Sequence, residues 1–324
     1  MDIKTLFQGF NEKKVLIIGD AMIDAYMWGE VNRISPEAPV PVVEVKKHEN
    51  RLGGAANVAL NLKALGANPF LCSVIGTDER GRLFEKLMKE SNLSTAGILT
   101  ANKRKTTIKT RVIAENKHQL RIDEEETFPI VHAEEFLKLT INLMNDIDVI
   151  ILQDYNKGVL TPKIIEGVIA YANKKGIPTI VDPKKLNFNS YKNCTIFKPN
   201  LAEIKAGMKI DFDDNNIAEI EQATTKLRKQ LSAKGVLLTL SERGICINSE
   251  KKFKHTSAFK KNIIDVSGAG DTVISVASLC LASNIDYTDL SMLSTLAGGI
   301  VCEEVGVVPI NKEKLLKQAL KHIS

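Results

Sequence analysis

The stretch from Asp265 to Ser283 contains the residues with the clearest chemical potential. It begins with Gly268, Ala269 and Gly270, reaches Asp271, and continues as an apolar pattern of helical length. Glycines ahead of a helix let several backbone N–H groups point toward one anion at the positive end of the helix dipole. A carboxylate beside such a site can accept a proton while the N–H groups stabilise negative charge. A plain glycine turn with Asp271 as N-cap is the alternative, and this stretch alone does not separate the two.

Polar residues follow the predicted strands of the chain. Strands that are apolar on both faces alternate with helices, as Val149–Leu152 and the following helix 162–174 illustrate. This alternation predicts a mostly parallel sheet with helices on both sides, in which ligands bind beyond the carboxyl ends of the strands. The polar residues at those ends are Asp20, Gln153, Asp154, Asp182, Lys184, Lys198, Asn200, Ser241 and Arg243. A single aspartate there is commonly a turn residue, but several together favour a site.

Two further motifs lie at predicted helix starts. Asn200 and Glu203 are one helical turn apart, and hard oxygen ligands of this kind suit Mg²⁺, usually through its water molecules. A capping box made by the same two residues explains the spacing equally well. Gly53 and Gly54 precede Asn57. These glycines would let a polyol approach while Asn57 binds a hydroxyl, or they reflect close packing of the helix.

Two stretches, residues 21–50 and 104–123, alternate polar and apolar residues and predict strands outside the core. The second stretch contains two such strands, joined by a turn near Asn116. Four basic residues in these stretches and two that follow predicted strands could hold a substrate phosphate, although any single one is more often a solvated surface residue. These residues are Arg33, Lys109, Arg111, Arg121, Lys157 and Lys184.

Composition limits the function classes. The 324 residues carry 44 basic and 39 acidic side chains, interspersed, with one tryptophan and five tyrosines, which does not indicate a nucleic-acid-binding protein. The sequence has no P-loop, no G-x-G-x-x-G after a strand and no H-E-x-x-H. There is no signal-peptide pattern, no apolar run long enough for a membrane span and no paired cysteine motif. We therefore expect a cytoplasmic protein without a membrane or nucleic-acid partner.

Three of these motifs together resemble the ribokinase (PfkB) family of sugar kinases. Asp265-x-Ser-Gly-Ala-Gly-Asp271 resembles the second family signature, Gly53-Gly-Ala-Ala-Asn57 the first, and Asn200-x-x-Glu203 the magnesium-associated motif. Residues 32–41, 154–158 and 198–200 are similar to the branch that phosphorylates D-glycero-β-D-manno-heptose 7-phosphate. There are two departures: Ser267 stands where Thr is frequent, and Asn156 where the branch commonly has Gly.

The resemblance implies a single kinase domain over residues 1–324. Its fold would be the ribokinase-like three-layer α/β/α domain, with a mostly parallel central sheet and a small β-sheet lid from about 21–50 and 104–123. It also implies a homodimer formed through the lid. Members of this branch are often the first half of a bifunctional kinase–adenylyltransferase. Because this sequence has no H-x-G-H motif, we expect a separate adenylyltransferase to supply the second activity.

The implied reaction transfers the γ-phosphoryl group of ATP to the anomeric hydroxyl of heptose 7-phosphate. The product, heptose 1,7-bisphosphate, would serve ADP-heptose and lipopolysaccharide core precursor synthesis. Asp271 would accept the proton, with the N–H groups of residues 268–270 holding the transferring group. Mg²⁺ would lie near Asn200 and Glu203. The nucleotide would lie along Ser241, Arg243 and Gly244. The expected substrate residues are Asp20, Gly53, Gly54, Asn57, Arg111, Lys157, Asp182 and Lys184.

Two alternatives stay open. One is a kinase of the same fold for another sugar, sugar phosphate or nucleoside, because the lid residues that select the substrate cannot be read from sequence. The other is a non-catalytic sugar- or nucleotide-binding protein. An intact Asp271 and a complete glycine loop argue against it, since a binding protein needs no proton acceptor.

Overall fold

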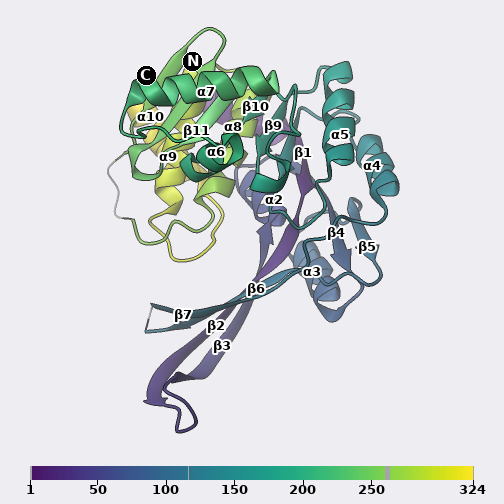
Figure 1. Cartoon of the computed structure of the whole chain (residues 1–324), viewed down its shortest axis with the longest axis vertical. Coiled ribbons are helices and arrows are strands. Elements are labelled where there is room, and N and C mark those ends of the chain that lie inside the picture. Colours follow the sequence, from purple (N-terminus) through teal and green to yellow (C-terminus); the bar gives the residue numbers. More distant parts are fainter. Residues whose placement is uncertain (1, 116, 260–262, 324) are drawn as a thin grey trace.

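The computed structural model describes residues 2–115, 117–259 and 263–323, and its body is built on one large sheet (Figure 1). Within the described residues this sheet has nine strands in the order β13-β12-β11-β10-β9-β8-β1-β4-β5. The strands from β11 to β5 are parallel, whereas β12 and β13 are antiparallel to their neighbours. The strands are β1 (Lys14–Gly19), β4 (Asn68–Gly76), β5 (Ile98–Ala101), β8 (Val149–Gln153), β9 (Thr179–Asp182), β10 (Ile196–Phe197), β11 (Gly235–Thr239), β12 (Ile245–Ser249) and β13 (Phe253–Thr256).

Helices cover both faces of this sheet, and each face has its own apolar core. Ile17 belongs to one core and its neighbour Ile18 to the other, because successive side chains of a strand point to opposite faces. The first core is covered by α1 (Ile3–Gly9), α2 (Ala55–Ala64), α3 (Glu79–Glu90), α8 (Ala269–Ala282), α9 (Tyr287–Val301) and α10 (Lys312–His322). The second is covered by α4 (Ala133–Asn142), α5 (Pro162–Lys175), α6 (Leu201–Met208) and α7 (Ile217–Leu231). The predicted three-layer α/β/α fold is confirmed.

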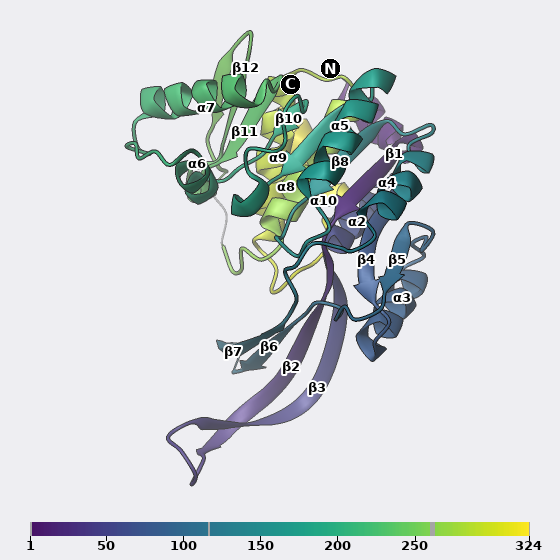
Figure 2. The same ribbon diagram turned by 45° about the vertical axis from the view of Figure 1, so that its right-hand side comes forward.

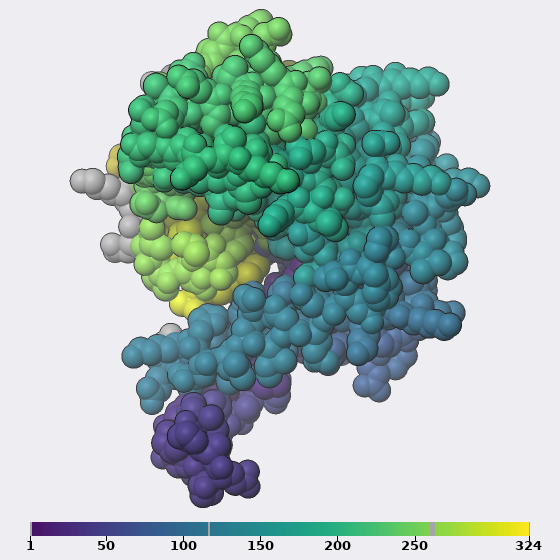
Figure 3. All heavy atoms as spheres, viewed as in Figure 1, coloured from purple at the N-terminus to yellow at the C-terminus, as the bar shows by residue number. Residues whose placement is uncertain are grey.

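A second sheet projects from the body (Figures 1 and 2). Its order is β3-β2-β6-β7, with β2 and β6 parallel and the two outer pairs antiparallel. The strands are β2 (Ala21–Ile34), β3 (Pro41–Gly54), β6 (Ile108–Ala114) and β7 (Lys117–Glu124). Figure 3 shows the far end of β2 and β3 standing clear of the body. A small β-sheet is therefore present, as predicted, while its action as a lid stays a prediction.

Sequence patterns located most elements but missed the short or half-exposed ones. The predicted strand Val149–Leu152 is part of β8, and the helix predicted over 162–174 is α5; each element is one residue longer than predicted. The elements α1, α4, β5 and β13 were not predicted. With seven, four and four residues, α1, β5 and β13 are too short to show a clear apolar period. The helix α4 has only two buried residues, Phe136 and Thr140. Short 3₁₀ turns lie at Phe10–Glu12, Lys185–Asn187 and Ser241–Arg243. Asn116, predicted in a turn, lies outside the described residues. In the part of the chain that the structure describes, no helix has the length and apolarity that crossing a bilayer requires.

Candidate active site

The glycine loop ahead of α8 has the conformation that an anion site needs. Gly268 is the N-cap residue, with a φ of 79° in the left-handed region that favours glycine. No side chain caps α8 among the described residues, and the N–H of Ala269 donates to Val266 O at 3.2 Å, so the N–H groups of Gly270 and Asp271 are the ones left for a ligand. Asp265 fixes the loop, because its carboxylate accepts hydrogen bonds from Ser267 N at 2.9 Å and Gly306 N at 2.9 Å. The arrangement suits a phosphate group at the helix N-terminus.

Asp271 lies in the first turn of α8 and is buried, with 7% of its surface exposed. Its Oδ2 accepts a hydrogen bond from Asn57 Nδ2 at 2.7 Å. Its Oδ1 accepts from Tyr155 Oη at 2.6 Å and from Gln153 Nε2 at 3.1 Å. The three donors come from α2, from β8 and from the loop that follows β8, so the carboxylate is oriented by three separate parts of the fold.

The surroundings of Asp271 raise its pKa to about 6. Burial is the main cause, and the negative charge of Asp182 adds to it. The hydrogen bonds from Tyr155 and Asn57, together with the positive charge of Lys198, act in the opposite direction. A carboxylate with this pKa is ionised at neutral pH and still basic enough to take a proton in a reaction, which is the property of a general base.

Beside Asp271 lies a buried ion pair between Asp182 and Lys198, with Oδ2 and Nζ 2.9 Å apart. Gln153 Nε2 also donates to Asp182 Oδ2 at 3.3 Å, which links the pair to the Asp271 cluster. A side chain added at Gly270 would meet Lys198 Nζ at 3.8 Å, so the glycine loop passes directly over this pair. Lys198 therefore brings a buried positive charge to the place where the loop N–H groups point.

Asn200 and Glu203 form the capping box at the start of α6. Asn200 Oδ1 accepts from Glu203 N at 2.8 Å, and Glu203 Oε2 accepts from Asn200 N at 2.9 Å. Glu203 Oε1 is paired with Lys184 Nζ. Both carboxylate oxygens of Glu203 thus have protein partners. The structure contains the capping box, which was the alternative to a metal site for this three-residue spacing. The two residues nevertheless line the same cleft as Asp271.

A cleft of about 480 Å³ joins these groups at the carboxyl ends of the parallel strands. Most of the predicted catalytic and nucleotide residues line it, as do the apolar side chains of Phe259, Val266 and Val273. The predicted residues brought together in the cleft are Asp182, Lys184, Asn200, Glu203, Ser241, Gly244, Gly268, Ala269, Gly270 and Asp271. Asn57 joins them through its hydrogen bond to Asp271.

Asp20 fixes the loop that follows β8, a role that the sequence did not predict. It is 1% exposed, and its carboxylate accepts hydrogen bonds from three backbone N–H groups, those of Tyr155 at 2.8 Å, Lys157 at 3.0 Å and Val159 at 3.0 Å. These bonds fix the loop after β8. Burial, the main cause, and the charge of Asp154 raise the pKa of Asp20. Substrate binding by Asp20 stays a prediction, beside the loop-fixing contacts that the structure shows.

Arg243 lies apart from the predicted nucleotide residues Ser241 and Gly244. Its Nη2 pairs with Asp214 Oδ2 at 2.7 Å, and its Nη1 donates to Asn215 Oδ1 at 3.3 Å. Arg243 lines a separate surface hollow, whereas its neighbours Ser241 and Gly244 line the main cleft. The guanidinium turns away from the nucleotide side because an acidic partner from the 213–216 loop holds it.

Two of the predicted basic residues, Lys109 and Arg111, lie on the same face of β6, which we call the charged face of the projecting sheet. Arg111 Nη1 pairs with Asp24 Oδ1 at 2.5 Å, and both side chains are largely buried. Gly53 lies directly over that aspartate, since a side chain there would come within 2.2 Å of Asp24 Oδ2. Gly54 has a φ of 59° and begins α2. The two predicted glycines are thus required by close approach and by backbone conformation, respectively.

Lys157 and Lys109 meet at one carboxylate. Their ammonium groups lie 2.7 Å and 2.8 Å from the two oxygens of Glu125, just beyond the end of β7. Both lysines are mostly buried, with 12% and 17% of their side chains exposed. In this arrangement Glu125 occupies a position between two cations where a substrate anion would also be attracted.

Sequence reasoning gave no role to Asp24, Gln153, Tyr155 or Lys198. Gln153 and Lys198 carried a signal, since both follow predicted strands. Tyr155 lies in the 154–158 stretch that resembles the heptose kinase branch, but a tyrosine at a strand end has no distinctive chemistry until its partner is known. Asp24 lies within a strand whose alternation indicates only an exposed sheet.

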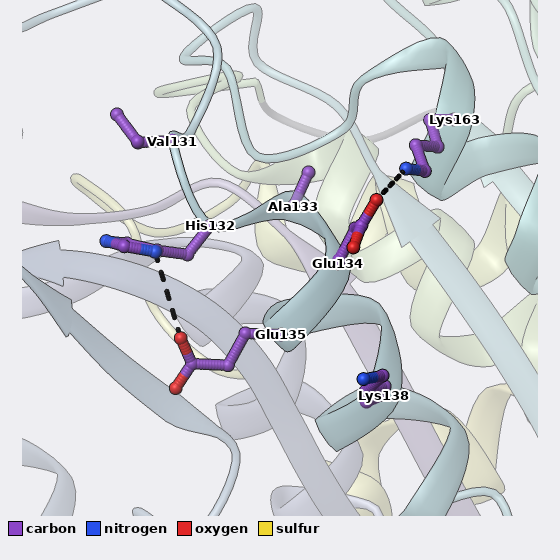
Figure 4. Close-up of a pocket in the computed structure, with 7 residues that line it drawn as sticks. All are labelled: Val131, His132, Ala133, Glu134, Glu135, Lys138 and Lys163. Carbon is purple, nitrogen blue, oxygen red and sulfur yellow. Dashed lines mark hydrogen bonds and ion pairs between the residues drawn. The ribbon is translucent and has the colours of Figure 1, made fainter.

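A second hollow lies at the starts of α4 and α5 (Figure 4). Lys163 pairs with Glu134 at 2.6 Å, and His132 Nδ1 lies 3.9 Å from Glu135. These groups are more than half exposed. Exposed pairs of this kind contribute little energy, and the hollow brings no buried polar groups together, so we do not consider it a catalytic site.

Comparison with known proteins gives the family. The model of the pfkB family carbohydrate kinases matches residues 12–314. Bifunctional protein HldE of Campylobacter jejuni is 38% identical over 309 residues, which cover 95% of this chain and 65% of that protein. Bifunctional protein HldE of Desulfatibacillum aliphaticivorans is 40% identical over 314 residues, covering 95% of this chain and 63% of that protein. The chain thus spans slightly less than two thirds of the length of these relatives.

Solved structures show the same fold. Phosphofructokinase-2 from Escherichia coli, in complex with substrates and products, superposes with a TM-score of 0.79 at 17% identity, covering 94% of this chain and 97% of that one. Ribokinase from Arabidopsis thaliana, complexed with ribose and ATP, gives a TM-score of 0.74 at 20% identity, covering 94% and 98%. The family match covers most of the chain and agrees with the glycine loop and buried aspartate described above, and we conclude that the protein belongs to the PfkB family of carbohydrate kinases.

Proposed function

We propose that this protein transfers the γ-phosphoryl group of ATP to the anomeric hydroxyl of D-glycero-β-D-manno-heptose 7-phosphate. The observation that carries the proposal is Asp271, a buried carboxylate with a raised pKa at the uncapped start of α8. The similarity to bifunctional HldE proteins and the resemblance of residues 32–41 and 154–158 to the heptose branch support the choice of substrate.

The proton and the phosphoryl group move in opposite directions. Asp271 takes the proton of the attacking hydroxyl, whose oxygen forms a bond to the γ-phosphorus as the bond from that phosphorus to the β-phosphate bridging oxygen breaks. The N–H groups at the start of α8 and the ammonium group of Lys198 stabilise charge on the transferring group. The products are the 1,7-bisphosphate and ADP, and the proton remains on Asp271 until solvent removes it.

The nucleotide and its metal would occupy the opposite end of the cleft. Ser241, Gly244 and the apolar residues near Phe259 support binding of ATP there. Both oxygens of Glu203 already have protein partners, so Asn200 and Glu203 fit a hydrated Mg²⁺ held through water rather than by direct bonds. When bound, the ion would neutralise charge on the nucleotide phosphates.

The sugar phosphate would lie against the charged face of the projecting sheet, which would act as a lid. Asp24 can accept hydrogen bonds from sugar hydroxyls, and Arg111 beside it adds a positive charge. The 7-phosphate would compete with Glu125 for Lys109 and Lys157. An acceptor without a distal phosphate cannot make this exchange, which is why a sugar phosphate fits better than a free sugar.

The proposal extends to two partners. Leu120 and Ile122 of β7 are 58% and 43% exposed, and such apolar residues on a projecting sheet support a homodimer formed through the lid. A separate adenylyltransferase would use the bisphosphate in ADP-heptose synthesis. Light scattering of the purified protein tests the first point, because a monomer at micromolar concentration would contradict it.

A substrate panel tests the reaction. The protein is incubated with ATP and Mg²⁺ and with heptose 7-phosphate, heptose, fructose 6-phosphate, ribose or adenosine, and products are identified by ³¹P NMR. We expect a new anomeric phosphate signal with heptose 7-phosphate and slow or no turnover with the others. Faster turnover of another acceptor would favour a different kinase of the same fold. Binding without turnover of any acceptor would favour the non-catalytic alternative.

A further inference from the structure

The two oxygens of Asp271 have unequal surroundings. Oδ1 accepts two hydrogen bonds, from Tyr155 Oη at 2.6 Å and Gln153 Nε2 at 3.1 Å. Oδ2 accepts one, from Asn57 Nδ2 at 2.7 Å. A carboxylate oxygen offers about two lone-pair directions, so Oδ1 is saturated while Oδ2 keeps one free. Oδ2 is therefore the oxygen that can receive a proton.

The hydroxyl of Tyr155 is held in place by its own loop. Asp20 accepts hydrogen bonds from the N–H groups of Tyr155 and Lys157, and Arg104 donates to the carbonyl oxygen of Lys157. Asn156, between Tyr155 and Lys157 in the chain, has a φ of 55°, a left-handed conformation that asparagine tolerates better than most residues. The buried charges of Asp20 and Arg104 thus fix the loop that carries the tyrosine.

Tyr155 acts only as a donor toward Asp271 at neutral pH. Burial, followed by the negative charges of Asp271 and Asp182, raises the pKa of its phenol well above the ordinary value. The phenol therefore keeps its proton, and at 2.6 Å that proton is directed to Oδ1. Hydrogen bonds to an ionised acceptor favour the ionised form and are stronger than those between neutral groups.

We propose that Tyr155 is a positioning residue for the catalytic base: its hydroxyl occupies Oδ1 and leaves Oδ2 as the proton acceptor. The inference rests on the proposed kinase function, because it assigns a role in the proton transfer. It goes further in stating which oxygen reacts and which side chain determines this. It also assigns a role to Asp20, which fixes the loop that carries Tyr155.

Other charged groups near Asp271 stay the same when the tyrosine hydroxyl is removed. Asp182, the last residue of β9, forms an ion pair with Lys198, which follows β10. Lys184, which pairs with Glu203, adds a positive charge. Asn57 remains the donor from α2. A change in the titration of Asp271 in a Tyr155→Phe variant can therefore be assigned to the lost hydrogen bond.

The chain offers a matched control in Tyr191. Its hydroxyl donates to Asp154 Oδ2, also at 2.6 Å, and it is fully buried, but it has no contact with Asp271. Tyr191→Phe thus removes the same kind of hydrogen bond, a tyrosine hydroxyl to a buried aspartate, at a position away from the cleft that Tyr155 lines. Both variants should lose stability, so a loss of stability alone does not distinguish them.

The test is the pH dependence of kcat/KM for the two variants and the wild type. In Tyr155→Phe the acid limb should move to higher pH by about 1 to 2 units, the shift expected from loss of one hydrogen bond to a charged group. The plateau value of kcat should fall roughly 10-fold or more because the base is less well oriented. Tyr191→Phe should keep the wild-type midpoint. An unshifted Tyr155→Phe profile, or an equal shift in both variants, would overturn the proposal.

A second readout does not depend on turnover. The carboxyl carbon of Asp271 is followed by ¹³C NMR during a pH titration and is assigned by its loss in Asp271→Asn. A higher titration midpoint in Tyr155→Phe than in the wild type supports the inference, and an unchanged midpoint refutes it. If the wild type phosphorylates no acceptor but this midpoint still shifts, the proposed function fails while the hydrogen-bond assignment stands.

Discussion

Replacing Asp271 by asparagine should stabilise the protein at alkaline pH relative to acidic pH. Burial and neighbouring charge raise the pKa of Asp271 from 3.8 to about 6 in the folded state. The folded form therefore holds this proton more tightly than the unfolded form. The stability that this preference contributes is complete below pH 3.8 and is lost as pH rises through about 6. Asparagine cannot ionise, so the variant avoids that loss.

The magnitude follows from the size of the shift. Each unit of pKa difference corresponds to about 1.4 kcal/mol, so ionising Asp271 costs the fold roughly 3 kcal/mol in total. Between pH 5 and pH 8 the change is about 1.4 kcal/mol, because by pH 5 the carboxyl is already ionised in the unfolded chain and the rest of the loss has occurred. The unfolding free energy of Asp271→Asn minus that of the wild type should therefore increase by this amount over the same interval.

Urea denaturation at pH 5, 6, 7 and 8 measures this difference. Asp78→Asn is the control: although burial opposes it, the hydrogen bonds from Thr106 and Gly81 lower the pKa of Asp78 below its ordinary value. Asp78 is therefore ionised in both folded and unfolded chains over this range, and its variant should show a difference independent of pH. If the difference in unfolding free energy between Asp271→Asn and the wild type does not change with pH, the pKa of Asp271 is not raised. The argument that Asp271 is suited to act as a general base would then fail.

Three further changes test other parts of the site. Asn200→Ala with Glu203→Ala should raise the Mg²⁺ concentration for half-maximal rate, and an unchanged titration would leave these residues as a capping box only. Arg111→Ala should raise KM for the sugar phosphate, and an unchanged KM would remove Arg111 from the substrate site. It should also lower the unfolding free energy by about 3 kcal/mol in urea denaturation, because Asp24 would be left buried without its partner. Gly306→Ala should lower Tm and reduce the unfolding free energy by about 1 to 2 kcal/mol. The φ of Gly306 is 75°, and the added carbon would lie 3.3 Å from an Arg51 nitrogen, so an unchanged Tm would contradict this expectation.

The parts of the site that depend on local sequence were predictable. A glycine at positive φ followed by a helix is a local pattern, so Gly268 and the start of α8 could be located without a structure. The same is true of Asn200 and Glu203, whose three-residue spacing makes a helix cap. For that pair the sequence left the cap and the metal site open, and the structure shows the cap.

The parts that depend on contacts across the fold were not predictable. Tyr155 matters because its hydroxyl meets Asp271, which is 116 residues later in the chain. Asp20 was assigned to the sugar because it ends a strand, but three N–H groups from a distant loop occupy its oxygens. Arg243 also follows a strand, and the partner that turns it away, Asp214, lies in a loop with no distinctive sequence pattern.

In the proposed mechanism, Asp271 accepts the proton of the attacking hydroxyl. The most direct measurement is the single-turnover rate of Asp271→Asn with heptose 7-phosphate, ATP and Mg²⁺, together with the Kd for nucleotide. We expect the rate to fall by about 10²- to 10⁴-fold while the nucleotide Kd changes little, because the side chain acts on the acceptor and not on ATP. A rate within a few-fold of the wild type would contradict the account.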